Sequence, residues 1–208
     1  MRRAGFILLV LLCLAISAYA LVGYGLQPLG ALVHPDMRRS FEAHRVGIYL
    51  HIFGALFALA LGPVQFMRSL RNSRPGLHRW TGRLYLGVGV LLGGGAGLAM
   101  AFFAFGGVVA RLGFGLLAVC WLWSGARAYA TVRRGDIDAH EMWMTRNFAL
   151  TLAAVTLRLW LPTLLATGVP FETAYPLVAW LCWVPNLALA EAFFVNRGTG
   201  APDRAAMA

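Results

Sequence analysis

The stretch FALTLAAVTLRLWLPTLLAT, residues 148–167, decides the fold of this chain. Its length matches the roughly twenty apolar residues that a helix needs to cross a bilayer. The single charge within it, Arg158, lies far from either end. An arginine at such a depth costs at least ~2.5–3.5 kcal/mol of insertion free energy unless it faces the protein interior and finds partners there. The stretch therefore predicts a transmembrane helix in a bundle whose interior is partly polar.

The composition of the whole chain is that of a membrane protein. Of its 208 residues, 60% are hydrophobic and only 12% are charged, whereas a soluble domain carries about 25% charged residues. The net charge of +10 comes from eighteen arginines without a lysine, and most of these arginines lie at the ends of apolar segments. Arginines in such positions set topology and contact anionic lipid headgroups. We therefore expect a lipid bilayer as the main partner, and we expect no nucleic acid binding.

Six apolar segments of roughly spanning length follow one another along the chain. They cover residues 5–26, 44–67, 81–104, 112–131, 146–167 and 174–195. The short connections between them predict antiparallel neighbours in one all-α, six-helix integral membrane bundle. We expect a first transmembrane helix with an outer loop, a five-helix membrane domain and a disordered tail, at residues 1–43, 44–195 and 196–208.

The arginines also predict the orientation of the bundle. The start Met1-Arg2-Arg3 resembles a signal peptide, but the apolar run that follows is long enough to span, so we expect an uncleaved helix. With a cytoplasmic N-terminus, thirteen arginines lie at cytoplasmic ends, and the outer side holds only four, Arg38, Arg39, Arg45 and Arg111. This positive-inside bias predicts a multi-pass protein of the bacterial cytoplasmic membrane with both termini in the cytoplasm.

Depth arithmetic sorts the polar residues into two layers. At about 1.5 Å of rise per residue, His51 lies about 10 Å and Arg158 about 12 Å below the outer boundary. An inner layer contains Gln65, His78, Arg79, Arg83, His140, Arg146, Asn147 and Glu191. We expect a polar core that includes Arg158 together with Gln65, Asn147, Asn186 and Glu191. Such intramembrane polar residues commonly mark function.

Small residues predict where two helices approach each other closely. His51, Gly54, Ala58 and Gly62 share one face of the second segment at 100° per residue, and the opposite face is bulky. The third segment carries glycines at four-residue spacing, Gly89, Gly93 and Gly97. Small-xxx-small spacing allows close contact between membrane helices, so we interpret these glycines as packing positions, with clearance for a flat cofactor as the alternative.

The inner layer suggests a b-type haem protein that exchanges electrons with a membrane quinone. His78 and His140 stand at the same level on alternate helices, as axial haem ligands do. Arg83 and Arg146 could bind the propionates, and Glu191 could orient a ligating histidine. His51 is a further candidate ligand, although the outer layer offers it no histidine partner.

Two other hypotheses fit the same residues. In one, the protein is a carrier or sensor for a small anionic or amphipathic molecule, with Arg158 as its anchor and His51 as a titrating partner. In the other, it is a structural or assembly protein whose polar groups only fasten helices. We find no nucleophile–base pair, nucleotide loop or HExxH pattern, and the three cysteines lack metal-ligand spacing. The sequence therefore assigns no catalytic residue and no metal.

Five stretches of the chain resemble one bacterial family. They are HIFGALFALALGPVQF (51–66), LHRWTGRLY (77–85), GFGLLAVCWLWSGARAYATVRRGDIDAHEMWMTRNFALT (113–151), AAVTLRLWLP (153–162) and AYPLVAWLCWVPNLALAE (174–191). The family they resemble is the one called domain of unknown function 2306. The resemblance implies a multi-pass bacterial membrane protein of unestablished activity, and it leaves the first helix outside.

Overall fold

The computed structural model describes residues 3–31 and 33–195, and in this part of the chain all regular structure is helical. The elements in chain order are α1 (Arg3–Gly25), α2 (Pro35–Ala43), α3 (Arg45–Gln65), α4 (Arg68–Ser73), α5 (Pro75–Leu84), η1 (Tyr85–Gly93), α6 (Gly94–Ala101), α7 (Gly107–Arg133), α8 (Ile137–Thr151), α9 (Ala153–Ala166), α10 (Phe171–Leu181), α11 (Val184–Ala190) and η2 (Glu191–Val195). The predicted tail, 196–208, lies outside the described residues.

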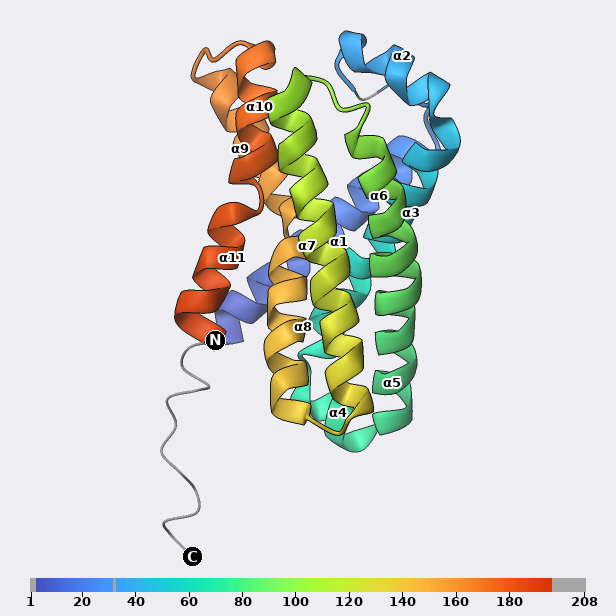
Figure 1. The fold of residues 1–208 in the computed structure, drawn as a ribbon, viewed down its shortest axis with the longest axis vertical. Helices are drawn as coiled ribbons and strands as arrows, with labels where there is room; N and C mark the ends of the chain where they lie inside the picture. The colour runs from blue at the N-terminus through green and yellow to red at the C-terminus, as the bar shows by residue number, and fades with distance from the viewer. Residues whose placement is uncertain (1–2, 32, 196–208) are drawn as a thin grey trace, which may run out of the picture.

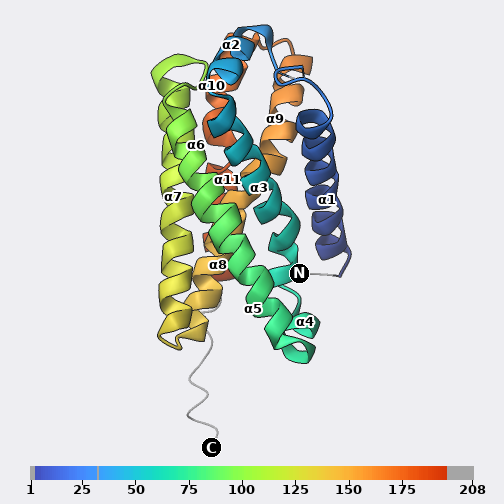
Figure 2. The ribbon, with the colours of Figure 1, turned by 90° about the vertical axis from the view of Figure 1, so that its right-hand side faces the viewer.

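Among the described residues, six helices are long and apolar enough to cross a membrane, which confirms the predicted bundle. They are Ala4–Gly25, Arg45–Gln65, Pro75–Ala101, Gly107–Arg133, Ile137–Ala166 and Phe171–Phe193. The first of these starts at the same height as the last one ends (Figures 1 and 2). We call the end that carries α2 the outer end, and the opposite end the arginine-rich end.

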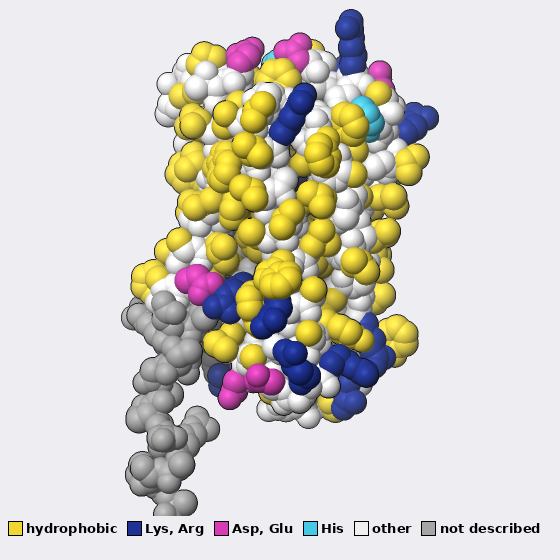
Figure 3. All heavy atoms as spheres, viewed as in Figure 1, with side chains coloured by type: hydrophobic (Ala, Val, Ile, Leu, Met, Phe, Trp, Pro, Cys, Tyr) yellow, Lys and Arg dark blue, Asp and Glu magenta, His cyan; other side chains and the backbone are white. Residues whose placement is uncertain are grey.

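The third, fourth and fifth spans are longer than the sequence predicted. They contain 27, 27 and 30 residues, which correspond to about 40–45 Å of helix against about 30 Å of hydrocarbon. The surplus forms the lower part of Figure 1, where α5, the end of α7 and the start of α8 project together with α4. Arginine side chains gather on this end, and hydrophobic side chains cover the middle of the visible face (Figure 3). A hydrocarbon core of about 30 Å would leave this part of the bundle at or beyond the headgroup layer.

Local sequence explains how these helices begin. Pro35 occupies the first turn of α2, where a missing N–H costs nothing. Asp136 caps α8 by accepting a hydrogen bond of 3.0 Å from the backbone N–H of Ala139. Gly106 precedes α7 with a φ of +88°, a left-handed conformation that glycine adopts without strain.

Glycines let α3 approach η1 closely, as the sequence predicted. A Cβ atom added to Gly54 would lie 2.5 Å from the Cα of Gly93, and one added to Gly89 would lie 2.7 Å from the Cβ of Ala58. Backbones this close exclude larger side chains. The segment η1 is a π-helix of nine residues, so its turns are wider than those of an α-helix.

The fifth and sixth spans differ from the predicted continuous helices, because each is interrupted near its middle. α8 gives way to α9 at Leu152, where Thr151 and Thr156 both donate hydrogen bonds to carbonyls of the preceding turn. Such back-bonding bends helices. α10 ends at Leu181 and α11 starts at Val184, next to Pro185, whose ring cannot continue the preceding helix.

The two interruptions contact each other. Asn186 Nδ2 donates to Ala149 O at 3.3 Å and to Thr156 Oγ1 at 3.1 Å. Cys182 O is a second acceptor within reach of the single hydroxyl proton of Thr156. These bonds satisfy carbonyls that an uninterrupted helix would have used. Asn186 thus lies in the polar interior and ties the fifth span to the sixth.

Candidate functional site

A cavity of about 550 Å³ occupies the outer half of the bundle. α1, α3, α6, α7, α9 and α10 form its walls, and α2 lies over its outer side. Both polar residues of the predicted outer layer, His51 and Arg158, line it. Most other lining side chains are apolar, among them Leu56, Leu59 and Phe114. The cavity is therefore mostly apolar and contains a few polar groups.

The guanidinium of Arg158 lines this cavity and has few polar partners among the described residues. Its Nη1 donates to Ala154 O at 2.8 Å, and its Cζ lies 5.5 Å from the ring centroid of Tyr19. In the described part of the chain, none of the ion pairs involves this arginine. A guanidinium carries five N–H donors, so most of its donors remain free to bind an anion.

His51 is fixed in one orientation beside the same cavity. Its Nδ1 lies 2.9 Å from Gly93 O. Because a carbonyl can only accept, Nδ1 carries the proton, and Nε2 of the neutral ring is left as an acceptor. Gly97 makes room for the ring, since a Cβ atom there would lie 2.6 Å from Nδ1.

The first helix contributes polar groups that the sequence analysis did not predict. Ser17 and Tyr24 both line the cavity, and the buried Ser17 Oγ has no hydrogen-bond partner among the described residues. Arg111 lies exposed at the outer end of α7 and also borders the cavity. Spacing within one helix cannot show which face of α1 meets α9, so neither Ser17 nor Tyr24 gave a signal.

A hydrogen-bonded network forms the floor of the cavity and fastens three helices. Tyr85 Oη donates to Asn147 Oδ1 at 2.7 Å, and Trp121 Nε1 donates to Thr151 Oγ1 at 2.9 Å. Asn147 Nδ2 donates to Trp121 O at 2.7 Å and to Ser124 Oγ at 2.8 Å. Tyr85 and Asn147 are completely buried. Every functional group of Asn147 is therefore satisfied, which makes this network a structural centre.

The two histidines of the proposed haem lie at the arginine-rich end, away from the cavity. His140 Nδ1 lies 2.8 Å from Ala128 O, and the buried His78 Nδ1 has no hydrogen-bond partner in the described residues. His140 is close enough to act electrostatically on His78. Neither side chain lines the outer cavity. Arg83 stacks on Trp80, with 5.7 Å between its Cζ and the ring centroid.

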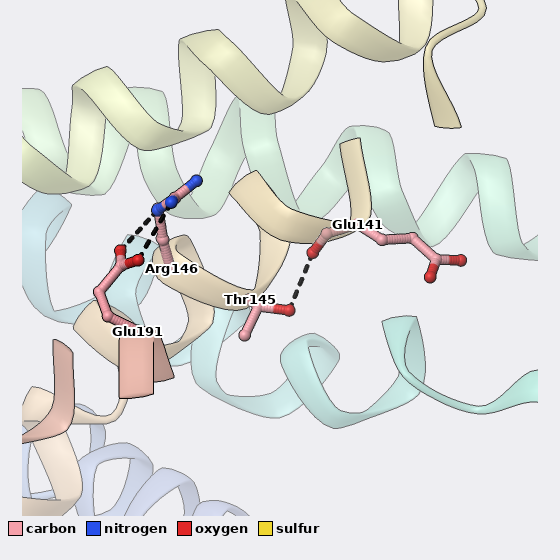
Figure 4. A network of polar contacts seen from close by, with 4 residues as sticks. All are labelled: Glu141, Thr145, Arg146 and Glu191. Atoms are coloured by element: carbon pink, nitrogen blue, oxygen red, sulfur yellow. Dashed lines mark hydrogen bonds and ion pairs between the residues drawn. The ribbon is translucent and has the colours of Figure 1, made fainter. Parts of the chain in front are cut away.

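Glu191 binds an arginine and not a histidine. Arg146 donates from Nε to Oε1 at 2.6 Å and from Nη2 to Oε2 at 3.1 Å. Figure 4 shows this two-bond contact between α8 and the start of η2, and it shows Glu141 directed away from it. Both carboxylate oxygens of Glu191 thereby have a partner. The guanidinium of Arg146, which was expected to bind a haem propionate, is paired as well. Gln65, the last of the predicted polar residues, donates to Thr81 Oγ1 at 2.9 Å.

The family model described as "Predicted membrane protein (DUF2306)" matches residues 48–194. The chain belongs to this family. The match runs from the first turn of α3 into η2, so it includes His51 and Arg158 but excludes the cavity wall that α1 supplies. No curated protein and no solved structure matches the chain. The family description gives a membrane location and no activity, and a function must come from the site itself.

Proposed function

We propose that the protein binds a small anionic amphipathic molecule in its outer cavity, as a carrier or sensor within the membrane. The observation that carries this proposal is Arg158, which forms no ion pair with the described residues and lies in the wall of an apolar cavity of about 550 Å³. A cation in such surroundings is costly unless an anion joins it. An incoming anion therefore gains an ion pair without first breaking one in the protein.

The lining groups indicate the chemistry of this ligand. Cavities of 300–1,000 Å³ hold drug-sized molecules, so the volume suits one headgroup with an apolar tail. Arg158 is the one cation at depth among the lining residues, since Arg111 is exposed at the end of its helix. This favours a single negative charge on the ligand. His51 Nε2 can accept, and Ser17 Oγ can donate, one hydrogen bond to the same headgroup.

The contrast with Asn147 argues against a purely structural role for Arg158. Asn147 has all its partners within the protein and needs no ligand. Among the described residues, Arg158 has one hydrogen bond, which it donates to Ala154 O of its own helix. We expect the protein to lie in the bacterial cytoplasmic membrane with both termini in the cytoplasm. A reporter that is active only in the periplasm would then be inactive when it is fused after Ala208.

Binding of a charged probe tests the proposal. The purified protein in detergent is titrated with a dansyl-labelled fatty acid and with its uncharged methyl ester. We expect the wild type to bind the acid more tightly than the ester. Arg158→Gln should remove this preference, and Arg134→Gln, at the opposite end of the bundle, should keep it. Equal binding of acid and ester by the wild type, or an unchanged preference in Arg158→Gln, would refute the proposal.

A b-type haem that exchanges electrons with quinone is a second candidate, because His78 in α5 and His140 in α8 both lie at the arginine-rich end. The Nδ1 of His140 is held by Ala128 O, which leaves Nε2 for a metal, the usual outer-shell arrangement. Protein from haem-replete cells would show a bis-histidine spectrum that His78→Ala and His140→Ala remove and His51→Ala retains. A protein without a Soret band excludes this candidate.

A further inference from the structure

Three charged side chains stand at one level near the arginine-rich end. Arg127, Arg146 and Glu191 each lie twenty residues from the outer end of their own span. At about 1.5 Å per residue this distance is about 30 Å, the thickness of the hydrocarbon core. All three side chains therefore lie where acyl chains give way to lipid headgroups.

The two arginines of this layer share one indole but differ in their partners. The Cζ of Arg146 lies 4.6 Å from the ring centroid of Trp143, and the Cζ of Arg127 lies 5.3 Å from it. Arg146 is neutralised by Glu191. Arg127 forms no ion pair with any described residue, and its buried Nε has no hydrogen-bond partner there. Arg127 therefore lacks the anion that its neighbour has.

Two tryptophans flank Arg127. Its Cζ lies 5.8 Å from the ring centroid of Trp123 as well as 5.3 Å from that of Trp143. Trp123 is 59% exposed, on the surface that meets lipid. Indole rings hold a guanidinium by cation–π attraction and leave the N–H groups at its edge free. A guanidinium edge binds phosphate oxygens through two parallel hydrogen bonds.

We infer that Arg127, Trp123 and Trp143 form a binding site for the phosphodiester of an anionic phospholipid. At the boundary level the membrane itself supplies phosphodiesters, and arginines near an anionic membrane surface are attracted to it by about 1 kcal/mol each. The outer cavity includes none of these three residues. This inference is therefore independent of the proposed function, and either can fail without the other.

Lipid retention measures the inference directly. The full chain is reconstituted in nanodiscs of phosphatidylcholine with a minor fraction of phosphatidylglycerol, released into detergent, and its bound lipids are counted by native mass spectrometry. We expect the wild type to retain phosphatidylglycerol in preference to phosphatidylcholine. Arg127→Gln should lower this preference about fivefold, the factor that corresponds to ~1 kcal/mol. Arg134→Gln, at an exposed position directly after the end of α7, should leave it unchanged.

Further arms keep the test decisive. Trp123→Leu should weaken retention while preserving the charge, and it replaces Arg127→Gln if that variant does not fold. Excess inorganic phosphate should not displace the lipid, whereas displacement would assign the site to free phosphate and overturn the lipid inference. Equal retention of the two lipids by the wild type would overturn it, and so would unchanged retention in both Arg127→Gln and Trp123→Leu.

Discussion

The floor of the outer cavity and the wall above it satisfy their polar groups in different ways. At the floor of the cavity and below it, Asn147 has hydrogen-bond partners on neighbouring helices and Arg146 has Glu191. In the outer cavity, Arg158 donates one hydrogen bond to a backbone carbonyl, and Ser17 Oγ has no hydrogen-bond partner in the described residues. Polar groups that are satisfied internally stabilise a fold, and polar groups left open in a cavity are available to a ligand. The difference separates structural positions from the proposed site.

The largest expected loss of stability comes from Asn147→Leu. This change leaves Tyr85 Oη and Ser124 Oγ with fewer partners at a fully buried position. The three side-chain hydrogen bonds that Asn147 forms contribute about 0.5–1.5 kcal/mol each, so we expect a loss of about 2–4 kcal/mol in the free energy of unfolding. Denaturant titration in detergent measures it. Thr145→Val, on the same helix, should cost less than ~0.5 kcal/mol; comparable losses in the two variants would mean that the network is not a structural centre.

Arg158→Leu should separate function from stability. On insertion scales the change favours membrane insertion of the fifth span by about 2.5–3.5 kcal/mol, yet binding of the dansyl fatty acid should disappear. Arg146→Leu is the matched variant in the other half, and it should destabilise the protein because Glu191 loses its partner. An insertion assay and the probe titration measure the two effects. The contrast between the halves fails if Arg158→Leu unfolds the protein.

A pair of glycines tests how His51 is positioned. Gly97→Ala places a Cβ atom 2.6 Å from His51 Nδ1, so the ring must leave Gly93 O. Such overpacking costs typically about 1–3 kcal/mol, and binding of the anionic probe should weaken with it. Gly95→Ala meets nothing within 4 Å and should be neutral or stabilising by up to ~1 kcal/mol. Parallel unfolding and binding curves compare the two, and similar curves would show that the ring has room to adjust.

The smallest effect is expected for Arg71→Gln. The ion pair between Arg71 Nη1 and Glu141 Oε1 spans 2.5 Å, but its side chains are 38% and 52% exposed. Exposed pairs contribute about 0–1 kcal/mol, so the variant should unfold almost as the wild type does. A loss of stability larger than that of Arg146→Leu would mean that the exposure of an ion pair at this end does not determine how much it contributes to the free energy of unfolding.

The two layers that the sequence analysis predicted correspond to different parts of the structure. His51 and Arg158 were placed at one depth because helical rise is nearly constant, and they do line one cavity. The depth of the inner layer was calculated from apolar segments that were taken to begin near residues 81 and 146. In the structure the third and fifth spans begin earlier, at Pro75 and Ile137. A helix that projects beyond the hydrocarbon core can contain polar residues at its end. Hydropathy alone therefore placed the start of these two helices too late in the chain.

The sequence by itself determined the six spans, the gathering of arginines at one end and the small residues between α3 and η1, because hydropathy and helical spacing are local properties of a chain. Only the tertiary structure decided that Arg146 binds Glu191, that Tyr85 binds Asn147, and that Ser17 faces the cavity of Arg158. These contacts join residues far apart in the sequence. They depend on helix crossings, on the interrupted fifth and sixth spans, and on the π-helical turns of η1, where counting 100° per residue no longer gives the face of a side chain.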